Sequence, residues 1–254
     1  MSELLRTENV SEVFGGLKAV TDFNIHLDRG ELVGLIGPNG AGKTTAFNMI
    51  TGVYTPTSGS VTLNSCSITG LRPDRIAHAG IARTFQNIRL FSELTVLENV
   101  KIAFHYHVKY GILESVFRIG RYFKEEEAIE KEAHSLLKIF HLDDKADEVA
   151  KNLPYGAQRR LEIARALAAK PKLLLLDEPA AGMNPQETKE LMDMIRWIRQ
   201  EFGLTILLIE HDMSLVMGIC ERIYVLEYGE IIAQGTPDEI KKNPEVIRAY
   251  LGGE

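Results

Sequence analysis

The chain has 254 residues, of which 45% are hydrophobic and 25% charged, so it is long enough to bury a core of its own. Its formal net charge of −6 argues against a broad electrostatic grip on nucleic acid, and we expect no nucleic-acid partner. No stretch has the pattern of a secretory signal, and no apolar run approaches the ~18 residues that suggest a membrane span.

Short β-rich runs separated by Gly and Asp turn residues fill the N-terminal third. The runs LLRTENV, GLKAVTDFNIHL and GSVTLNSCSI predict a small antiparallel sheet. The last run contains Cys66, and Cys220 is the second cysteine of the chain. Because two cysteines are too few for a disulfide framework and lack metal-ligand spacing, we expect both to be buried, reduced thiols.

A phosphate-binding loop interrupts these strands. GPNGAGKT (37–44) fits the pattern G-x-x-x-x-G-K-[ST], and it lies between an apolar strand, LVGLI, and a helix, TTAFNMI. Glycines in the loop let successive backbone N–H groups face the phosphates, while Lys43 neutralises the β and γ phosphates. Thr44 is placed to bind Mg²⁺ and Thr45 to reach another phosphate. The predicted nucleotide-binding residues are Gly37, Pro38, Asn39, Gly40, Ala41, Gly42, Lys43, Thr44 and Thr45.

Two further apolar runs, LLLLD (173–177) and TILLIE (205–210), predict core strands of a parallel α/β sheet, with a helix over 185–203 between them. Two acids end the first run, where such a sheet places its metal-binding carboxylate. Asp177 is expected to bind Mg²⁺ through water, and Glu178 to polarise the water that attacks the γ-phosphate. Following a phosphate loop, this pair predicts a hydrolytic site.

Helices are predicted in the middle of the chain. Residues 125–141 form an amphipathic pattern with the apolar stripe Ile129, Ala133, Leu136, Leu137 and Phe140. The preceding segment, 101–123, is aromatic-rich and basic. Two interpretations of it stay open: a solvated helical insertion with a packed aromatic face, or a docking surface for a partner or for anionic headgroups. His105 and His107 lack a third ligand nearby in sequence, so we expect no metal site there.

The C-terminal stretch follows a different pattern. IYVLEYGEIIAQG (223–235) predicts a hairpin, and TPDEIKKNPEVIRAYLGG (236–253) predicts two short helices with Pro near their starts.

With these motifs the chain resembles the nucleotide-binding subunits of ABC transporters over essentially its whole length. The resemblance implies one ABC ATPase domain over residues 1–254, with a helical subdomain at about 88–165. The implied fold class is α/β: a P-loop NTPase core with a parallel sheet, an antiparallel β subdomain and an inserted helical subdomain. The implied cofactors are ATP and Mg²⁺.

The resemblance also implies roles for single residues. In that family an aromatic residue before an N-terminal Gly stacks on adenine, and Phe14 in EVFGGLKAV matches it. A glutamine between the nucleotide motifs contacts the metal and the water, and Gln86 in ARTFQNIRLF matches it. A histidine holds the γ-phosphate and orients the catalytic Glu; His211 in LLIEHDM matches it, although its pattern alone leaves a structural role equally open. The implied catalytic residues are Lys43, Gln86, Glu178 and His211, and the implied metal ligands are Thr44, Gln86 and Asp177.

LPYGAQRR, at the start of the stretch 153–167, occupies the place of the family's signature, usually LSGGQ, which covers the nucleotide held by a second copy. Pro154 replaces a Ser, Tyr155 a Gly and Ala157 the Gln, while Gly156 remains. The resemblance therefore implies nucleotide contacts in trans from Pro154, Tyr155 and Gly156, in a weakened but usable half-site. PAAGMNP (179–185) resembles the loop that passes between the two nucleotide-binding subunits.

The chain is most similar to the ATP-binding subunits of branched-chain amino-acid importers, the LivG type; urea or amide importers and lipopolysaccharide exporters share much of the pattern. The implied partners are a second ABC ATPase subunit (an identical copy or a paralogue), integral-membrane permease subunits and, indirectly, a solute-binding protein. The permease is expected to dock near Gln86 and residues 88–123, at the cytoplasmic face of the inner membrane. A soluble ABC protein and a regulatory module that binds ATP without hydrolysing it are the alternatives.

Overall fold

The computed structural model describes residues 2–251, with no side-chain description at Ile112, Leu113 and Leu251. Residues 252 and 253, the last two of the predicted C-terminal stretch, lie outside this range, as does residue 254. The chain divides into two compact units: one runs to Gln86 and resumes at Lys172, and the other spans Asn87–Pro171. Within residues 2–251, no helix is both long and apolar enough to cross a membrane.

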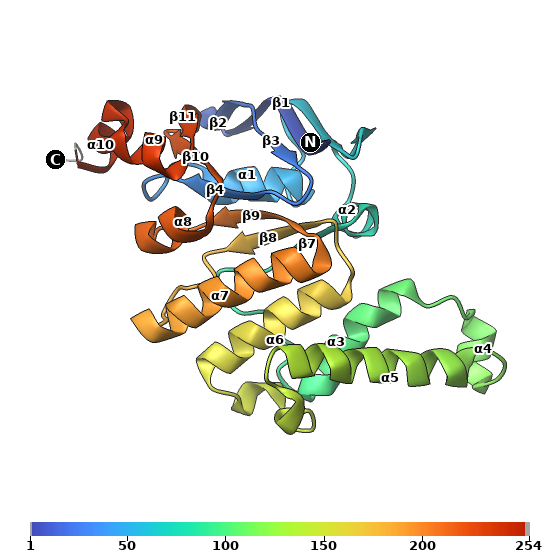
Figure 1. Ribbon diagram of the computed structural model, residues 1–254. Helices are drawn as coiled ribbons and strands as arrows, with labels where there is room; N and C mark the ends of the chain where they lie inside the picture. The colour runs from blue at the N-terminus through green and yellow to red at the C-terminus, as the bar shows by residue number, and fades with distance from the viewer. Residues whose placement is uncertain (1, 252–254) are drawn as a thin grey trace. The chain divides into compact units, whose positions relative to one another are not determined.

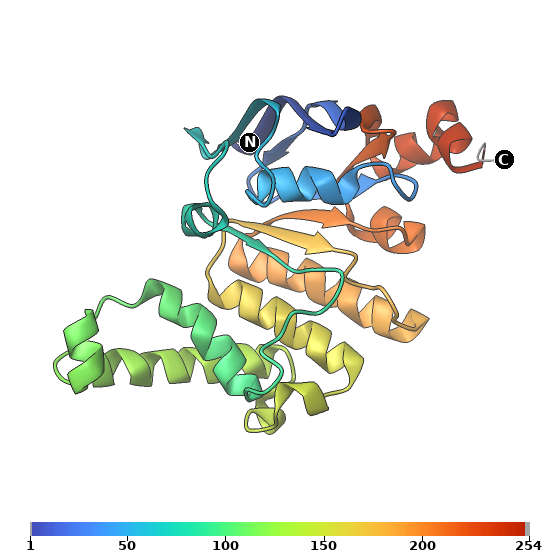
Figure 2. The same ribbon diagram turned by 180° about the vertical axis from the view of Figure 1, so that it is seen from behind.

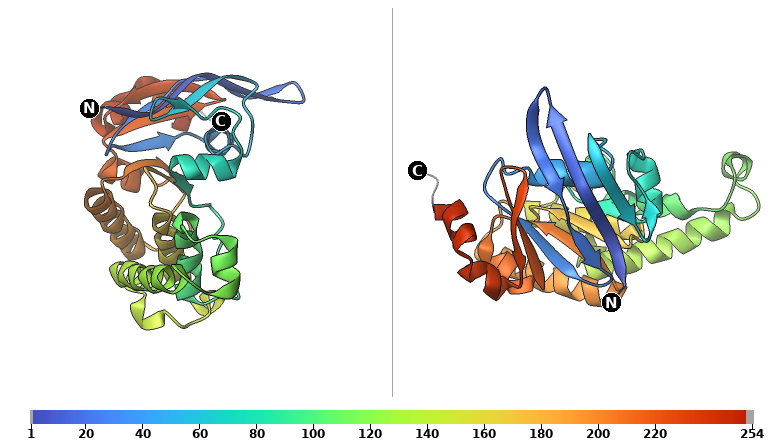
Figure 3. Two further views of the ribbon diagram at one scale, coloured as in Figure 1. Left: turned by 90° about the vertical axis from the view of Figure 1, so that its right-hand side faces the viewer. Right: turned by 90° about the horizontal axis from the view of Figure 1, so that it is seen from above.

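The N-terminal strands of the first unit form an antiparallel sheet, as predicted. β1 pairs antiparallel with β2, β3 and β5, and β5 pairs with β6. Figure 3 shows β1 and β2 as a long hairpin. The bounds are β1 (Glu3–Phe14), β2 (Leu17–Phe23), β3 (His26–Asp28), β5 (Ser58–Leu63) and β6 (Cys66–Ser67).

A second, mostly parallel sheet forms the centre of this unit, in the order β11-β10-β4-β9-β8-β7. All neighbouring strands are parallel except β11, which pairs antiparallel with β10 as the predicted hairpin. The carboxyl ends of β4, β8 and β9 therefore meet at one edge. The bounds are β4 (Leu32–Ile36), β7 (Ile81–Arg83), β8 (Leu173–Asp177), β9 (Thr205–Ile209), β10 (Arg222–Glu227) and β11 (Glu230–Gly235).

Helices cover both faces of the parallel sheet (Figures 1 and 2). Alternate strand residues such as Leu35 and Leu175 join one hydrophobic cluster with Phe47 of α1 and Phe23 of β2. On the opposite face, an added Cβ at Gly34 would lie 3.1 Å from the Cys220 sulfur after α8. The helices of this unit are α1 (Lys43–Ile50), α2 (Pro73–Ala79), α7 (Pro185–Phe202), α8 (Met213–Ile219), α9 (Pro237–Lys242) and α10 (Pro244–Leu251).

The expectation of two buried cysteines is half wrong. Cys220 is buried, and burial raises the pKa of its thiol. Cys66 is exposed, because it lies in β6, a two-residue strand at the edge of the antiparallel sheet where both residues face solvent.

The second unit is helical. Its elements are α3 (Val96–Phe104), η1 (His105–His107), α4 (Ile112–Phe117), α5 (Tyr122–Ile139), η2 (Asp143–Lys145), η3 (Ala150–Asn152) and α6 (Tyr155–Ala168). The amphipathic prediction for 125–141 is confirmed, although α5 begins three residues earlier at Tyr122; the predicted stripe, including Phe140 at the helix end, is buried. Thr95 and Glu98 form a capping box at the start of α3.

Candidate nucleotide site

The phosphate loop joins β4 to α1 and is held tightly by its neighbours. A Cβ at Gly37 would lie 2.0 Å from the carbonyl oxygen of Leu226 on β10. A Cβ at Gly42, the residue that caps α1 with a φ of 103°, would lie 2.7 Å from the carbonyl oxygen of Ala19. Glycine is required at both places because backbone from two other strands leaves no room for a side chain.

Lys43 is buried within this loop. Its Nζ donates to the carbonyl oxygens of Gly37 (2.6 Å) and Pro38 (2.9 Å). Burial lowers the pKa of Lys43, and the nearby carboxylates of Glu178 and Asp177 oppose that shift. The loop therefore fixes the ammonium group of Lys43 at its centre. Phosphate oxygens can replace the two carbonyl oxygens as its hydrogen-bond acceptors.

A cavity of about 630 Å³ opens beside the loop. It joins most of the predicted phosphate-binding residues to Gln86 and Glu178, which come from elsewhere in the sequence. The lining residues are Leu17, Lys18, Ala19, Asn39, Gly40, Ala41, Gly42, Lys43, Thr44, Thr45, Gln86, Glu178 and Tyr228. Segments separated by more than a hundred residues thus share one cavity that begins at a helix N-terminus, a place suited to an anion.

Asp177 ends β8 and is almost fully buried, with an exposed fraction of 3%. Its Oδ2 accepts a hydrogen bond of 2.6 Å from Arg83, at the end of the neighbouring strand β7. Arg83 also donates to Asn48 of α1 at 2.7 Å, and its guanidinium lies over the rings of Phe47 and Phe85. Sequence reasoning missed Arg83, because only the pairing of β7 with β8 brings it to Asp177.

Glu178 follows Asp177 with a left-handed backbone, at a φ of 45°. A non-glycine residue rarely adopts this conformation, and such strain concentrates at functional sites. Its Oε2 accepts a hydrogen bond of 2.8 Å from Gln86 Nε2 and lies 3.6 Å from Nδ1 of His211. The His211 side chain is 60% exposed. The structure therefore brings together three of the predicted catalytic residues around one carboxylate oxygen.

Phe14 lies at the end of β1 and is 41% exposed. Its ring contacts Tyr54 edge to face, with centroids 5.1 Å apart. The large apolar side chains in the cavity lining are Leu17 and Tyr228. The predicted stacking of Phe14 on adenine stays a prediction.

The signature-like segment lies in the helical unit. Pro154 caps α6 without a side-chain hydrogen bond, and Tyr155 is the first helical residue. The Tyr155 hydroxyl accepts a 3.2 Å hydrogen bond from Arg159, a fully buried residue that also pairs with Glu162 at 2.8 Å. Gln158 donates to the carbonyl oxygen of Leu153 at 2.8 Å. The substituted residues are therefore built into the first turn of a regular helix.

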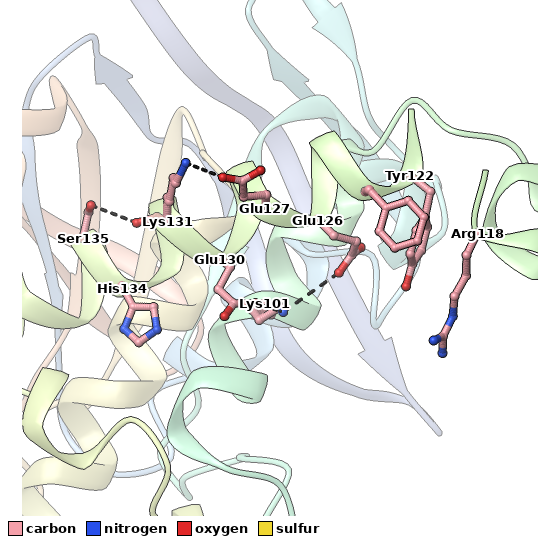
Figure 4. A pocket seen from close by; sticks show the side chains of 10 residues that line it. Lys101, Arg118, Tyr122, Glu126, Glu127, Glu130, Lys131, His134 and Ser135 are labelled. Carbon is pink, nitrogen blue, oxygen red and sulfur yellow. Dashed lines mark hydrogen bonds and ion pairs between the residues drawn. The ribbon is translucent and has the colours of Figure 1, made fainter. Parts of the chain in front are cut away.

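Residues 116–123, from the end of α4 to the first turn of α5, form an exposed apolar tip. Val116, Phe117, Ile119 and Phe123 are each more than half exposed, whereas Tyr110 and Tyr122 pack edge to face at 5.3 Å. Beside this tip, a cavity of about 730 Å³ is lined by Lys101, Arg118, Tyr122, Phe123, Glu126, Glu127, Glu130, Lys131, His134 and Ser135 (Figure 4). Ion pairs on its wall join Lys101 to Glu130 and Lys131 to Glu127, so these carboxylates are engaged within the unit.

No group of three or more His, Cys, Asp or Glu side chains forms a metal site among residues 2–251. His105 instead contacts Glu126 at 2.8 Å. Mg²⁺ commonly takes only one or two carboxylates and relies on substrate phosphates for the rest of its ligands. Thr44 and Gln86 line the cavity and Asp177 ends β8 directly before Glu178, and their oxygens are hard donors of the kind that such an ion takes.

The fold and this site define an ATP-binding cassette, and the chain belongs to the ABC transporter family: the family model described as ABC transporter matches residues 20–181. A second model, described as branched-chain amino acid ATP-binding cassette transporter, matches residues 230–254. The chain is 50% identical to the high-affinity branched-chain amino acid transport ATP-binding protein LivG of Escherichia coli K12, over 98% of each chain.

Solved structures agree with this family. The crystal structure of the ADP conformation of an ATP-binding cassette of an ABC transporter is 35% identical and superposes with a TM-score of 0.86, covering 100% of both chains. A dimeric post-hydrolysis state of an ATP-binding cassette bound to ADP and Pi is 27% identical, with a TM-score of 0.78, covering 92% of this chain and 99% of the other. The predicted fold class is confirmed, and the chain is an ABC-type ATPase.

Proposed function

We propose that this chain hydrolyses ATP to drive branched-chain amino-acid uptake through a membrane permease. The 50% identity to LivG over 98% of both chains carries the choice of solute, and the match of residues 230–254 to the branched-chain model supports it. Other subunits of such a transporter contact the solute, so the fold alone does not select it.

The hydrolytic roles follow from the contacts around Glu178. This carboxylate polarises the attacking water, and His211, 3.6 Å away, orients Glu178 and donates to the γ-phosphate. Lys43 stabilises charge on the phosphates from the centre of the loop. Gln86 donates to Glu178 at 2.8 Å, and in the proposed mechanism its side chain also contacts the metal and the attacking water. Gln86 and His211 both lie close to Oε2 of Glu178, and this arrangement supports a catalytic rather than a regulatory cassette.

Mg²⁺ is the proposed cofactor at the edge of the same cavity. The Thr44 hydroxyl, the Asp177 carboxylate and the amide oxygen of Gln86 would hold it, and hard oxygen donors are its preferred ligands. When bound, Mg²⁺ neutralises charge on the phosphate oxygens. Arg83 holds the Asp177 carboxylate in place, because it donates to Oδ2 at 2.6 Å.

We propose that a second cassette, identical or paralogous, completes each site. The N-terminus of α6 with Pro154, Tyr155 and Gly156 would cover the γ-phosphate of the partner, where helix N–H groups favour an anion. The similar cassette solved as a dimer bound to ADP and Pi supports this arrangement. Substitution of the usual signature Ser by Pro154 removes a hydroxyl donor and makes this half-site the poorer of two.

The permease is proposed to dock on residues 88–123, at the cytoplasmic face of the cell membrane, with a solute-binding protein acting indirectly. The exposed side chains of Phe117, Ile119 and Phe123 support the docking interpretation of this segment. Single exposed apolar residues are ordinary on a protein surface, whereas several within a few residues of one another are typical of an interaction site. Crosslinks from permease loops should map to this segment.

Solute uptake by the source cells tests the proposed function. Cells carrying Glu178→Gln should lose ATP-driven uptake of radiolabelled leucine, isoleucine and valine, while urea uptake continues. If the Glu178→Gln cells take up leucine normally but lose urea uptake or show a defect in lipopolysaccharide export, the cassette would instead be assigned to one of those related systems.

A further inference from the structure

Glu210 is a buried carboxylate at the carboxyl end of β9, with an exposed fraction of 0%. Its Oε1 accepts a hydrogen bond of 2.8 Å from the backbone N–H of Ala180. Its Oε2 accepts from the backbone N–H groups of His211 at 3.1 Å and Asp212 at 3.5 Å. One side chain thus uses both of its oxygens to hold two segments of backbone.

The two segments carry the hydrolytic residues. Ala180 lies two positions after Glu178, in the loop that follows β8, and His211 begins the loop that follows β9. These strands are parallel neighbours, with Asp177 paired to Ile209. The loops therefore leave the sheet side by side, and Glu210 joins them at the point where their separation decides how far His211 lies from Glu178.

The imidazole of His211 lies within reach of both carboxylates. Its Nδ1 is 3.6 Å from Glu178 Oε2 and 3.8 Å from Glu210 Oε2. Since the ring itself is largely exposed, packing holds it weakly, and its position depends on the backbone that Glu210 fixes.

Ionisation of this buried carboxylate has a cost in the folded protein. Burial raises the pKa of Glu210, and the three backbone N–H groups and the charge of His211 offset that shift only in part. Because the folded pKa lies above the ordinary value, ionised Glu210 destabilises the folded state as pH rises through that pKa.

We propose that Glu210 is a positioning residue that holds the loop of Glu178 and the loop of His211 at the separation hydrolysis requires. The proposal rests on the proposed roles of Glu178 and His211. A carboxylate is needed because both of its oxygens accept hydrogen bonds. An amide would turn its NH₂ group toward one of the backbone donors, and an aspartate is one methylene too short to reach both loops.

The test compares Glu210→Gln with Thr205→Val at the other end of the same strand. Thr205 is also buried, and its hydroxyl accepts a hydrogen bond of 2.9 Å from Gly30 N–H. Loss of that hydroxyl in Thr205→Val therefore reports a structural effect on β9 away from the cavity. We expect Glu210→Gln to lower kcat about 10- to 100-fold, as loss of a supporting contact does in other sites. The Kd for ATP, which depends on the phosphate loop, should stay unchanged, and Thr205→Val should keep the kcat of the folded protein.

Two further readouts separate positioning from stability. Hydrogen exchange of the Ala180 and His211 amides should be faster in Glu210→Gln than in Thr205→Val. Combined with Glu178→Gln, the Glu210→Gln change should lower the residual rate no further, because residues that act as one unit are not additive. If Glu210→Gln does not fold, Glu210→Asp replaces it, with the same expected loss of kcat.

A Glu210 variant with the kcat of Thr205→Val, or with a further loss in the Glu178→Gln background, would overturn the proposal. Wild-type turnover by Glu178→Gln would instead refute the hydrolytic roles on which it rests. A low kcat in Glu178→Gln together with a normal kcat in the Glu210 variant overturns the positioning role alone.

Discussion

Arg83 donates to the carboxylate of Asp177 at 2.6 Å, and both side chains are at least nine-tenths buried. The same guanidinium reaches Asn48 on α1, the helix that follows the phosphate loop. The proposed metal ligand is therefore tied through one cation to the element that carries Thr44. Because Arg83 donates to one carboxylate oxygen of Asp177, the other oxygen would be the one directed toward a bound metal or its water.

Replacing Arg83 by Gln should leave Asp177 buried without its cation. Removal of one partner from a buried ion pair commonly costs about 3–5 kcal/mol, so we expect a loss of that order in the free energy of unfolding. Urea denaturation measures it. Arg75→Gln is the control, since that side chain is 73% exposed and lies 4.0 Å from Asp74. Equal stability of the two variants would show that the Arg83 pair contributes nothing.

Alanine substitutions at Gly37 and Gly40 distinguish the steric cost of an added Cβ from the cost of a positive φ alone. Gly37→Ala should destabilise the protein by about 3 kcal/mol or more and abolish ATP binding, because its Cβ meets the Leu226 oxygen at 2.0 Å. Gly40 also has positive φ but open space around its Cα, so Gly40→Ala should cost only about 1–2 kcal/mol. Calorimetric titration with ATP and thermal unfolding measure both effects. ATP binding by Gly37→Ala at wild-type affinity would contradict the steric account.

Glu126 lies on α5, in the wall of the cavity drawn in Figure 4, and joins this helix to residues 105–110. It accepts hydrogen bonds of 2.8 Å from His105 and from Tyr110, and the pKa of Tyr110 is raised to about 12 by burial and by this contact. Burial raises the pKa of Glu126, but the hydrogen bonds from Tyr110 and His105 and the charge of Lys101 outweigh it, and the net shift is downward.

Because the folded pKa of Glu126 lies below the unfolded one, its ionised form stabilises the fold above the ordinary Glu pKa of about 4.3, and that contribution is lost as pH falls through the folded value. Glu126→Gln should therefore lower the unfolding free energy by about 1 kcal/mol at neutral pH and by less in acid. Urea denaturation across a pH series measures the difference. Glu127→Gln on the same helix, where the carboxylate is exposed, is the control; a pH-independent gap for Glu126→Gln would contradict the linkage.

Pro154→Ser should strengthen ATP-driven closure of the cassette dimer. Ser is a preferred helix cap and restores a hydroxyl donor, and one hydrogen bond to a charged phosphate is worth roughly 1.5–3 kcal/mol. We expect the dimer Kd in Mg-ATP to fall about tenfold or more, measured by light scattering in the Glu178→Gln background. Pro237→Ser, at the start of α9, is the control for a proline at a helix start. An unchanged dimer Kd would refute the idea that Pro154 weakens this half-site.

Much of this fold was readable from the sequence because its signals are local. LLLLD coincides with β8, and the phosphate-loop flanks coincide with β4 and α1. The helix predicted from residue 185 begins there, since Asn184 and Glu187 form a capping box and Pro185 is well tolerated at the first position.

The contacts missed by sequence reasoning join distant segments. Arg83 and Asp177 are brought together only by pairing of β7 with β8, which no local pattern specifies. Glu210 ends an apolar strand as Asp177 does, so the same signal was present, yet only the structure shows its carboxylate turned inward toward Ala180. Exposure of Phe117 and Cys66 also depends on tertiary neighbours.

Steady-state ATP hydrolysis by the wild type and by Glu178→Gln, with ATP affinity measured alongside, tests the central claim most directly. General-base catalysis typically contributes a factor of 10² or more, so the variant should bind ATP as the wild type does and turn it over at least about 100-fold more slowly. Hydrolysis by Glu178→Gln at the wild-type rate would contradict the assignment of this cavity as the hydrolytic site.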